Sequence, residues 1–196
     1  GSEFLSAQFA ERLTAFRLKD VPKDVVRHAK LLLLDTLGAM LAASNPKYSA
    51  TRILMEYARQ VGGRPESSLV GRPGKTSCVN AALVNGTLGY YCDIEPHHVG
   101  GILHAPAVMV PASLAVGEKL GASGARLLEA MILGIEVTCR VSYALNPTAL
   151  YNRGFHPSAV CGAFGAAAAA GRLFRLDAKK TAIALGLAMQ QASGLL

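Results

Sequence analysis

The sequence predicts an all-α protein, and three observations carry that prediction. Of the 196 residues, 51% are hydrophobic and only 17% are charged, so the chain can bury a sizeable core. Apolar residues recur at helical spacing through most of the chain. Only residues 67–70 have the composition of a strand. Together these features favour a single domain built from many packed helices.

The first third of the chain is expected to form three helices. Apolar residues of segment 5–16 lie on one helical face, which predicts the first helix. The second begins at Pro22, because proline suits a first helical turn, and ends before Asn45-Pro46. The third covers residues 53–61 and stops at Gly62-Gly63.

Helices are expected to fill the rest of the chain as well. Ser123 and Asp177 are good N-cap residues, since their side-chain oxygens can accept hydrogen bonds from free N–H groups of the first turn. The remaining helices are predicted at about residues 78–90, 106–120, 125–145, 157–174 and 178–196.

Four of the five histidines fall in two short polar segments between these helices. Residues 93–104 contain three of them together with two carboxylates, and residues 154–158 contain the fourth. Histidine is the side chain whose ordinary pKa lies near neutrality. Histidines clustered with carboxylates in loops therefore indicate proton transfer or metal binding.

Prolines predict where two of these histidines lie. His104 stands two residues before Pro106, and His156 stands immediately before Pro157. A residue before proline is extended, and proline opens a helix, so both imidazoles are expected at helix N-termini. Two such termini facing one cleft would attract a di- or tricarboxylate, with imidazoles ready to exchange protons. The alternative is that each histidine only caps or packs at its helix start.

A metal site is a weaker alternative. The segment offers enough ligands for zinc, but it lacks the HExxH and HxH spacings, and a solvated acidic loop is equally compatible. We therefore predict no metal. The residues concerned are Asp93, Glu95, His97, His98 and His104.

Charge and composition exclude several other classes. The formal net charge of +7 comes from basic residues scattered singly, and the chain has no Trp, so nucleic-acid binding is not expected. Such dispersed charge suits attraction of small anions. The four cysteines show no CxxC spacing, no apolar run is long enough for a membrane span, and no signal peptide is evident, which predicts a cytoplasmic protein with free thiols.

Residues 71–76 resemble the end of a phosphate-binding P-loop. The first glycine of that motif would fall at Leu69, and Pro73 removes one of the N–H groups that would cradle a phosphate. We interpret the segment as a basic turn between a short strand and a helix.

Several motifs in order along the chain closely resemble the MmgE/PrpD family. The resemblance covers essentially the whole chain. The matching segments are Ala29-Lys30-Leu31-Leu32-Leu33-Leu34-Asp35-Thr36-Leu37-Gly38, Gly62-Gly63-Arg64-Pro65, Val70-Gly71-Arg72, Asn80-Ala81-Ala82-Leu83-Val84-Asn85-Gly86-Thr87, the Asp93 loop with His104, and Gly154-Phe155-His156-Pro157-Ser158.

The resemblance implies an enzyme of small polycarboxylates. Members have a helical domain and a smaller α/β lid, need no cofactor, are commonly dimeric, and move a proton next to a carboxylate. Residues 5–196 would be the N-terminal part of the helical domain without the lid, following a cloning scar at residues 1–4. The family's catalytic lysines would lie beyond residue 196, so this fragment alone is expected to be inactive.

The resemblance also assigns residues. It implies Asp93, His104 and His156 as catalytic, and we add His97, His98 and Ser158 as substrate-binding. The family loop usually reads Asp-Phe-Asp-Asp-Thr-His, whereas this chain has Pro96 for an acid and His97 for the threonine, which leaves the substrate open.

The expected reaction is dehydration of the 2-methylcitrate dehydratase type. Decarboxylation of the cis-aconitate decarboxylase type and epimerisation are alternatives within the same family. Outside it, the alternatives are a non-catalytic helical scaffold or dimerisation module and a metal hydrolase.

Overall fold

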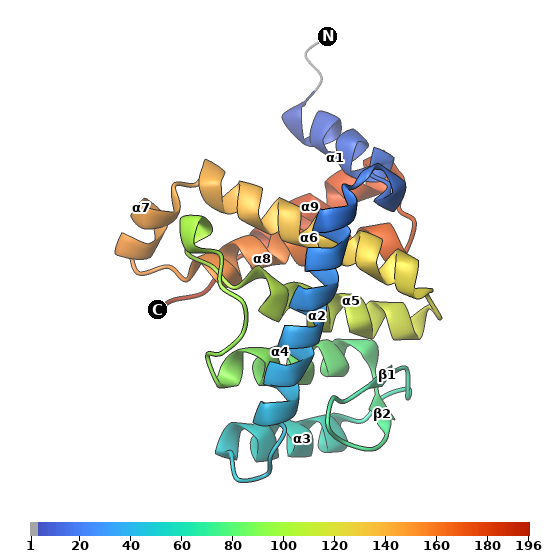
Figure 1. Ribbon diagram of the computed structural model, residues 1–196, viewed down its shortest axis with the longest axis vertical. Coiled ribbons are helices and arrows are strands. Elements are labelled where there is room, and N and C mark those ends of the chain that lie inside the picture. The colour runs from blue at the N-terminus through green and yellow to red at the C-terminus, as the bar shows by residue number, and fades with distance from the viewer. Residues whose placement is uncertain (1–3) are drawn as a thin grey trace.

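Helices account for nearly all regular structure in residues 4–196, the part of the chain that the computed structural model describes (Figure 1). The all-α prediction is confirmed. Of the proposed cloning scar, residues 1–3 lie outside the described residues, and Phe4 immediately precedes the first helix. The helices are α1 (Leu5–Ala15), α2 (Lys23–Ala43), α3 (Ser49–Val61), α4 (Cys78–Tyr91), α5 (Ala105–Lys119), α6 (Gly124–Ala144), α7 (Pro147–Asn152), α8 (Pro157–Leu173) and α9 (Ala178–Gln191), with 3-10 turns η1 (Leu18–Asp20) and η2 (Val99–Gly101).

Helix α2 connects the two ends of the fold. In Figure 1 it runs along the vertical axis, and it packs on α4, α5 and α6. The largest buried cluster joins these helices through side chains such as Met40, Leu88, Met109 and Met131. Burying side chains of this size from several helices is the main stabilising contribution to such a domain.

Helix α8 packs on α5, α6 and α9. Its closest neighbour is α6, where Gly134 and Gly165 face each other. A side chain at Gly165 would overlap Thr138 Oγ1 and the Gly134 carbonyl, so only glycine permits this approach. Close packing of α6 on α8 fixes where the N-terminus of α8 lies.

The caps predicted for α6 and α9 are confirmed. Ser123 Oγ accepts a hydrogen bond from Arg126 N at 3.4 Å, and Asp177 Oδ1 accepts one from Lys180 N at 2.8 Å.

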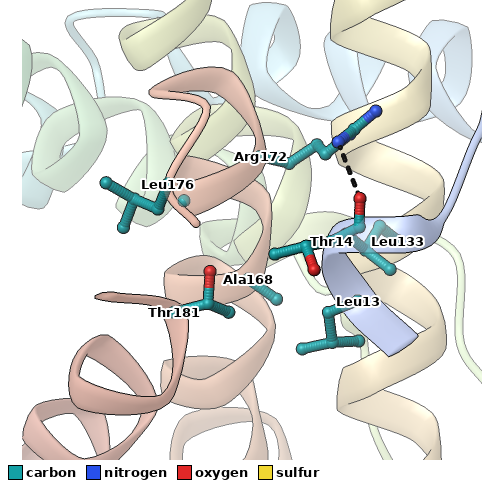
Figure 2. A pocket seen from close by; sticks show the side chains of 8 residues that line it. Leu13, Thr14, Leu133, Ala168, Arg172, Leu176 and Thr181 are labelled. Carbon is teal, nitrogen blue, oxygen red and sulfur yellow. Dashed lines mark hydrogen bonds between the residues drawn. The ribbon is translucent and has the colours of Figure 1, made fainter. Parts of the chain in front are cut away.

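Helix α1 is held to α8 by an arginine network. Figure 2 shows Arg172 donating to the Thr14 carbonyl, at 3.3 Å, above a small pocket lined by Leu13, Leu133 and other side chains. The same guanidinium donates to Glu129 Oε1 at 2.6 Å, and Glu129 Oε2 accepts from Leu18 N at 2.7 Å. Because these groups satisfy one another, the network is structural.

The predicted strand is shorter than expected and has a partner. β1 (Ser67–Ser68) pairs antiparallel with β2 (Lys75–Thr76), so the P-loop-like segment is a turn between two strands rather than between a strand and a helix. Gly71 and Gly74 adopt positive φ in this turn, as glycine readily does. Two-residue strands are too short to show a sequence periodicity, which is why β2 was missed.

The C-terminal end was predicted wrongly. Helix α9 ends at Gln191 instead of continuing to residue 196, because Ala192 has an extended backbone with ψ 101. Gly194, with φ +146, then lies against Ala159. The last residues pair with the segment before α8: Gly194 O accepts from His156 N at 3.1 Å, and Leu196 N donates to Gly154 O at 3.0 Å. The short helix α7 was also not predicted.

Among the described residues, no helix combines the length and apolarity needed to cross a membrane.

Candidate active site

Two histidines occupy the same position in two different helices. His104 is the N-cap residue of α5 and His156 is that of α8, and each helix has proline in its first turn. The predicted positions are confirmed. Neither imidazole makes a side-chain capping hydrogen bond, so the alternative that these histidines serve as caps is not supported. Both rings are left available for other partners.

Tyr90, in the last turn of α4, lies between the two rings. Its centroid is 5.2 Å from that of His104 and 5.4 Å from that of His156, edge-on in both cases. Ser158 links the same segments, because its buried Oγ accepts a hydrogen bond from His104 N at 2.9 Å. The two histidine segments, 52 residues apart in sequence, therefore meet in one site.

Glu95 is a further neighbour of the His104 ring. Its Oε1 lies 3.1 Å from His104 Nδ1, and its side chain is completely buried. From the part of the chain that the structure describes, no hydrogen bond of regular geometry reaches either Glu95 oxygen or His104 Nδ1. Burial raises the pKa of the Glu95 carboxyl, and the nearby His104 charge opposes that rise.

His97 and Asp93 lie at the exposed edge of this cluster. The His97 ring is 4.6 Å from the His104 ring, and its pKa is lowered first by desolvation and then by the charges of His104 and His98. Asp93 adopts a left-handed backbone with φ 52, which an Asp tolerates better than most residues. Its side chain is close to Glu95 and His104, although the nearer carboxylate to His104 Nδ1 is that of Glu95.

Three of the five residues in the metal alternative come together. Ligand atoms of Asp93, Glu95 and His104 all lie within 4.8 Å of one another, whereas His97 and His98 are not part of this group. Three protein ligands with open positions would suit a catalytic zinc site. The same three groups equally suit proton transfer, with one carboxylate buried against an imidazole.

His98 holds the loop together. Its Nδ1 accepts a hydrogen bond from Gly101 N at 2.9 Å, its backbone pairs with Leu103, and its ring packs edge-on against Tyr143. Ile102 closes the η2 turn with φ 50, a strained conformation for a β-branched residue. The substrate-binding role expected for His98 stays a prediction.

The floor of the site is apolar and unreactive. Leu103, Ala105, Cys139 and Cys161 form one buried cluster beneath the two helix N-termini. Burial raises the pKa of the Cys139 thiol to about 11 and also raises that of Cys161. Neither thiol is therefore suited to act as a nucleophile.

An open groove of about 870 Å³ runs beside His156. Tyr90, Ser158 and apolar side chains from α4, α5 and α8 line it together with His156. Burial, and secondarily the charge of His104, lowers the pKa of His156, which favours its neutral imidazole.

Sequence reasoning missed two residues of this site. Tyr90 was treated only as the end of a helix, and Glu95 only as a candidate metal ligand. Position 95 carried a usable signal, since an acid stands there within a histidine-rich loop. Tyr90 carried none, because its place between two distant histidines depends on how α4, α5 and α8 pack.

Comparison with known proteins shows the family of the chain. Residues 7–196 match the family model described as the MmgE/PrpD N-terminal domain. The chain belongs to the MmgE/PrpD family. Two of the motifs that suggested the family from sequence, the Asp93 loop with His104 and Gly154-Phe155-His156-Pro157-Ser158, contribute to the site described above.

Relatives with curated descriptions include three examples. The cis-aconitate decarboxylase-like protein oryM of Aspergillus oryzae is 31% identical, over 98% of this chain and 41% of its own length. The cis-aconitate decarboxylase of Aspergillus terreus is 30% identical, over 90% of this chain and 37% of its own length. The human cis-aconitate decarboxylase is 27% identical, over 96% of this chain and 40% of its own length. The chain thus spans about two fifths of the length of these MmgE/PrpD relatives.

Proposed function

We propose that the full-length protein is a lyase that acts on a small di- or tricarboxylate by proton transfer next to a carboxylate. The observation that carries this proposal is the pair of imidazoles, His104 and His156, at two helix N-termini on either side of Tyr90. Cis-aconitate decarboxylation is the reaction named for its relatives, which supports the lyase class.

Electrostatics favour an anionic substrate at this site. The positive ends of the α5 and α8 helix dipoles attract carboxylates. The net charge of +7 adds a long-range attraction in the same sense. A substrate with two or three carboxylates could engage both termini at once.

The proton chemistry would be shared by the two histidines. Loss of carbon dioxide, or removal of a proton before loss of water, leaves an electron pair next to a carboxylate. His104 and His156 are placed to abstract or deliver the proton that either reaction requires. Asp93 would hydrogen-bond the substrate or a histidine, while His97, His98 and Ser158 would contact the substrate.

Among the possible reactions, decarboxylation of cis-aconitate has the most support from relatives, and dehydration of a 2-methylcitrate-like substrate is the alternative. A cytoplasmic homodimer that needs neither metal nor cofactor remains part of the proposal.

The test is a substrate panel on the full-length protein. Cis-aconitate and 2-methylcitrate are incubated separately, and products are identified by proton NMR with carbon dioxide release measured in parallel. We expect turnover of one of them. In parallel, calorimetry with citrate should show binding to the present chain that His156→Ala weakens about tenfold or more.

The matched control is His28→Ala, since His28 is the one histidine outside the two segments and is exposed on α2. A non-catalytic scaffold would show neither turnover nor citrate binding sensitive to His156→Ala. The absence of both effects would overturn the proposal.

A further inference from the structure

The contact between Glu95 and His104 is the most unusual polar feature of the described residues. A carboxylate with no accessible side-chain surface lies 3.1 Å from an imidazole nitrogen that is itself buried. Burying an ionisable side chain is costly unless it gains a partner. Within residues 4–196, the only ion-pair partner of Glu95 is His104.

The contact is oriented with respect to the ring. His104 Nδ1 has essentially no accessible surface, yet 17% of the His104 side chain is exposed. The accessible edge of the imidazole is therefore made of its other atoms. In a five-membered ring with Nδ1 turned inward to Glu95, Nε2 is the nitrogen left for a substrate.

The His104 backbone is also fixed. Its N–H donates to Ser158 Oγ at 2.9 Å, and its carbonyl accepts from Ala107 N at 3.2 Å in the first turn of α5. With the backbone held, the remaining freedom of the residue is the rotation and the tautomer of its ring. Glu95 is the group that can decide both.

We propose that Glu95 is the positioning residue of His104: its carboxylate accepts the Nδ1 proton and holds the ring in the tautomer whose Nε2 faces the substrate. The effect of Glu95 on catalysis rests on the proposed function, whereas its effect on the His104 tautomer does not. A carboxylate on the far nitrogen of a histidine sets the ring's tautomer and orientation.

Other charged groups around His104 do not offer the same contact. His97 and His156 carry no acceptor charge, and Tyr90 presents its ring edge-on. Asp93 is exposed at the rim, so water competes for its oxygens. Glu95 alone combines burial with ion-pair distance to Nδ1.

The first test is the tautomer of His104, which does not depend on turnover. Nitrogen-15 labelled histidine in the 196-residue chain gives only five imidazoles to assign, and the His104→Ala spectrum identifies the signal. At neutral pH we expect the proton on Nδ1 and a bare Nε2. In Glu95→Gln, whose amide can donate as well as accept, we expect that preference to be lost.

The second test is kinetic and uses the full-length protein. Glu95→Gln should lower kcat about 10- to 100-fold with little change in KM, and should shift the pH profile, whereas Glu95→Asp should restore part of kcat. Glu129→Gln is the matched control. It removes a half-buried carboxylate, the partner of Arg172, and should lower stability without moving the His104 tautomer or the pH profile.

Two outcomes would overturn the positioning role. One is a wild-type His104 that carries its proton on Nε2, which needs no variant to fold. The other is a Glu95→Gln protein with an unchanged tautomer and pH profile. If no substrate of the panel is turned over but the tautomer depends on Glu95, the proposed function fails while the positioning contact stands.

Discussion

His104 and His156 share a backbone position and one aromatic neighbour, but they differ in their other surroundings. Each is the last residue before a helix that opens with proline, and each ring lies edge-on to Tyr90. His104 faces a buried carboxylate and two further polar side chains of its own loop. His156 has no carboxylate partner and lines an apolar groove.

The difference shows what each level of structure determines. The local sequence places both rings at helix N-termini, where the helix field acts on them equally. The surroundings of each ring come from other parts of the chain. His104 faces Glu95 from the loop after α4, whereas His156 is surrounded by side chains of α4, α5 and α8. Two N-cap positions thereby yield one imidazole beside a buried carboxylate and one imidazole beside an apolar groove.

The largest expected effect comes from removing either ring. In the full-length protein, His104→Ala and His156→Ala should each lower kcat about 10²- to 10⁴-fold, because general acid–base catalysis contributes a factor of that size. KM should change much less, and His28→Ala should behave like the wild type. Steady-state kinetics on the preferred substrate measure all three. Near wild-type turnover in both variants would show that the two rings are not the proton-transfer pair.

A smaller effect is expected from the hydroxyl that joins the two helix starts. Ser158→Ala removes the acceptor for His104 N, leaving a part-buried N–H unpaired, and should lower the free energy of unfolding by about 1–3 kcal/mol. Denaturant unfolding followed by circular dichroism measures the change.

Ser113→Ala is the matched control for Ser158→Ala. Ser113 is equally buried on α5, but its Oγ has no hydrogen-bond partner, so its removal should be neutral or stabilising. Equal destabilisation by the two variants would mean that the Ser158 contact adds nothing beyond the packing of the side chain.

Sequence reasoning predicted the long helices, two caps and the positions of both histidines, because these follow from periodicity and from proline within a few residues. It did not predict the pairing of β1 with β2, the six residues of α7, or the end of α9, which depend on short or distant contacts. Gly194 illustrates this, since a side chain there would overlap Ala159, 35 residues earlier in the chain.

The residues of the site also divide into those that local motifs predict and those that depend on packing. His104, His156 and Asp93 could be chosen from local motifs, whereas Tyr90 and the inward turn of Glu95 required the packing of three helices. Burial is the physical reason: it sets the pKa of Glu95 and of His156, and it is a property of the whole fold.

The smallest expected effect is the pH dependence of stability that the neutral His156 produces. Because the folded pKa of His156 lies below its ordinary value of 6.5, the unfolded chain binds more protons at this residue in the interval between the two values. The free energy of unfolding of the wild type, relative to His156→Gln, should therefore fall as the pH drops through about 6.5.

Denaturant unfolding at about pH 7.5 and about pH 5.5 measures this difference, and His28→Gln corrects for the loss of a histidine at an exposed position. Taking the difference between wild type and variant cancels the contributions of Glu95 and His97, which titrate in both proteins. A difference that instead increases on acidification would mean that folding stabilises the His156 imidazolium. His156 would then resemble His104 in having an anionic partner, and the contrast between the two helix starts would disappear.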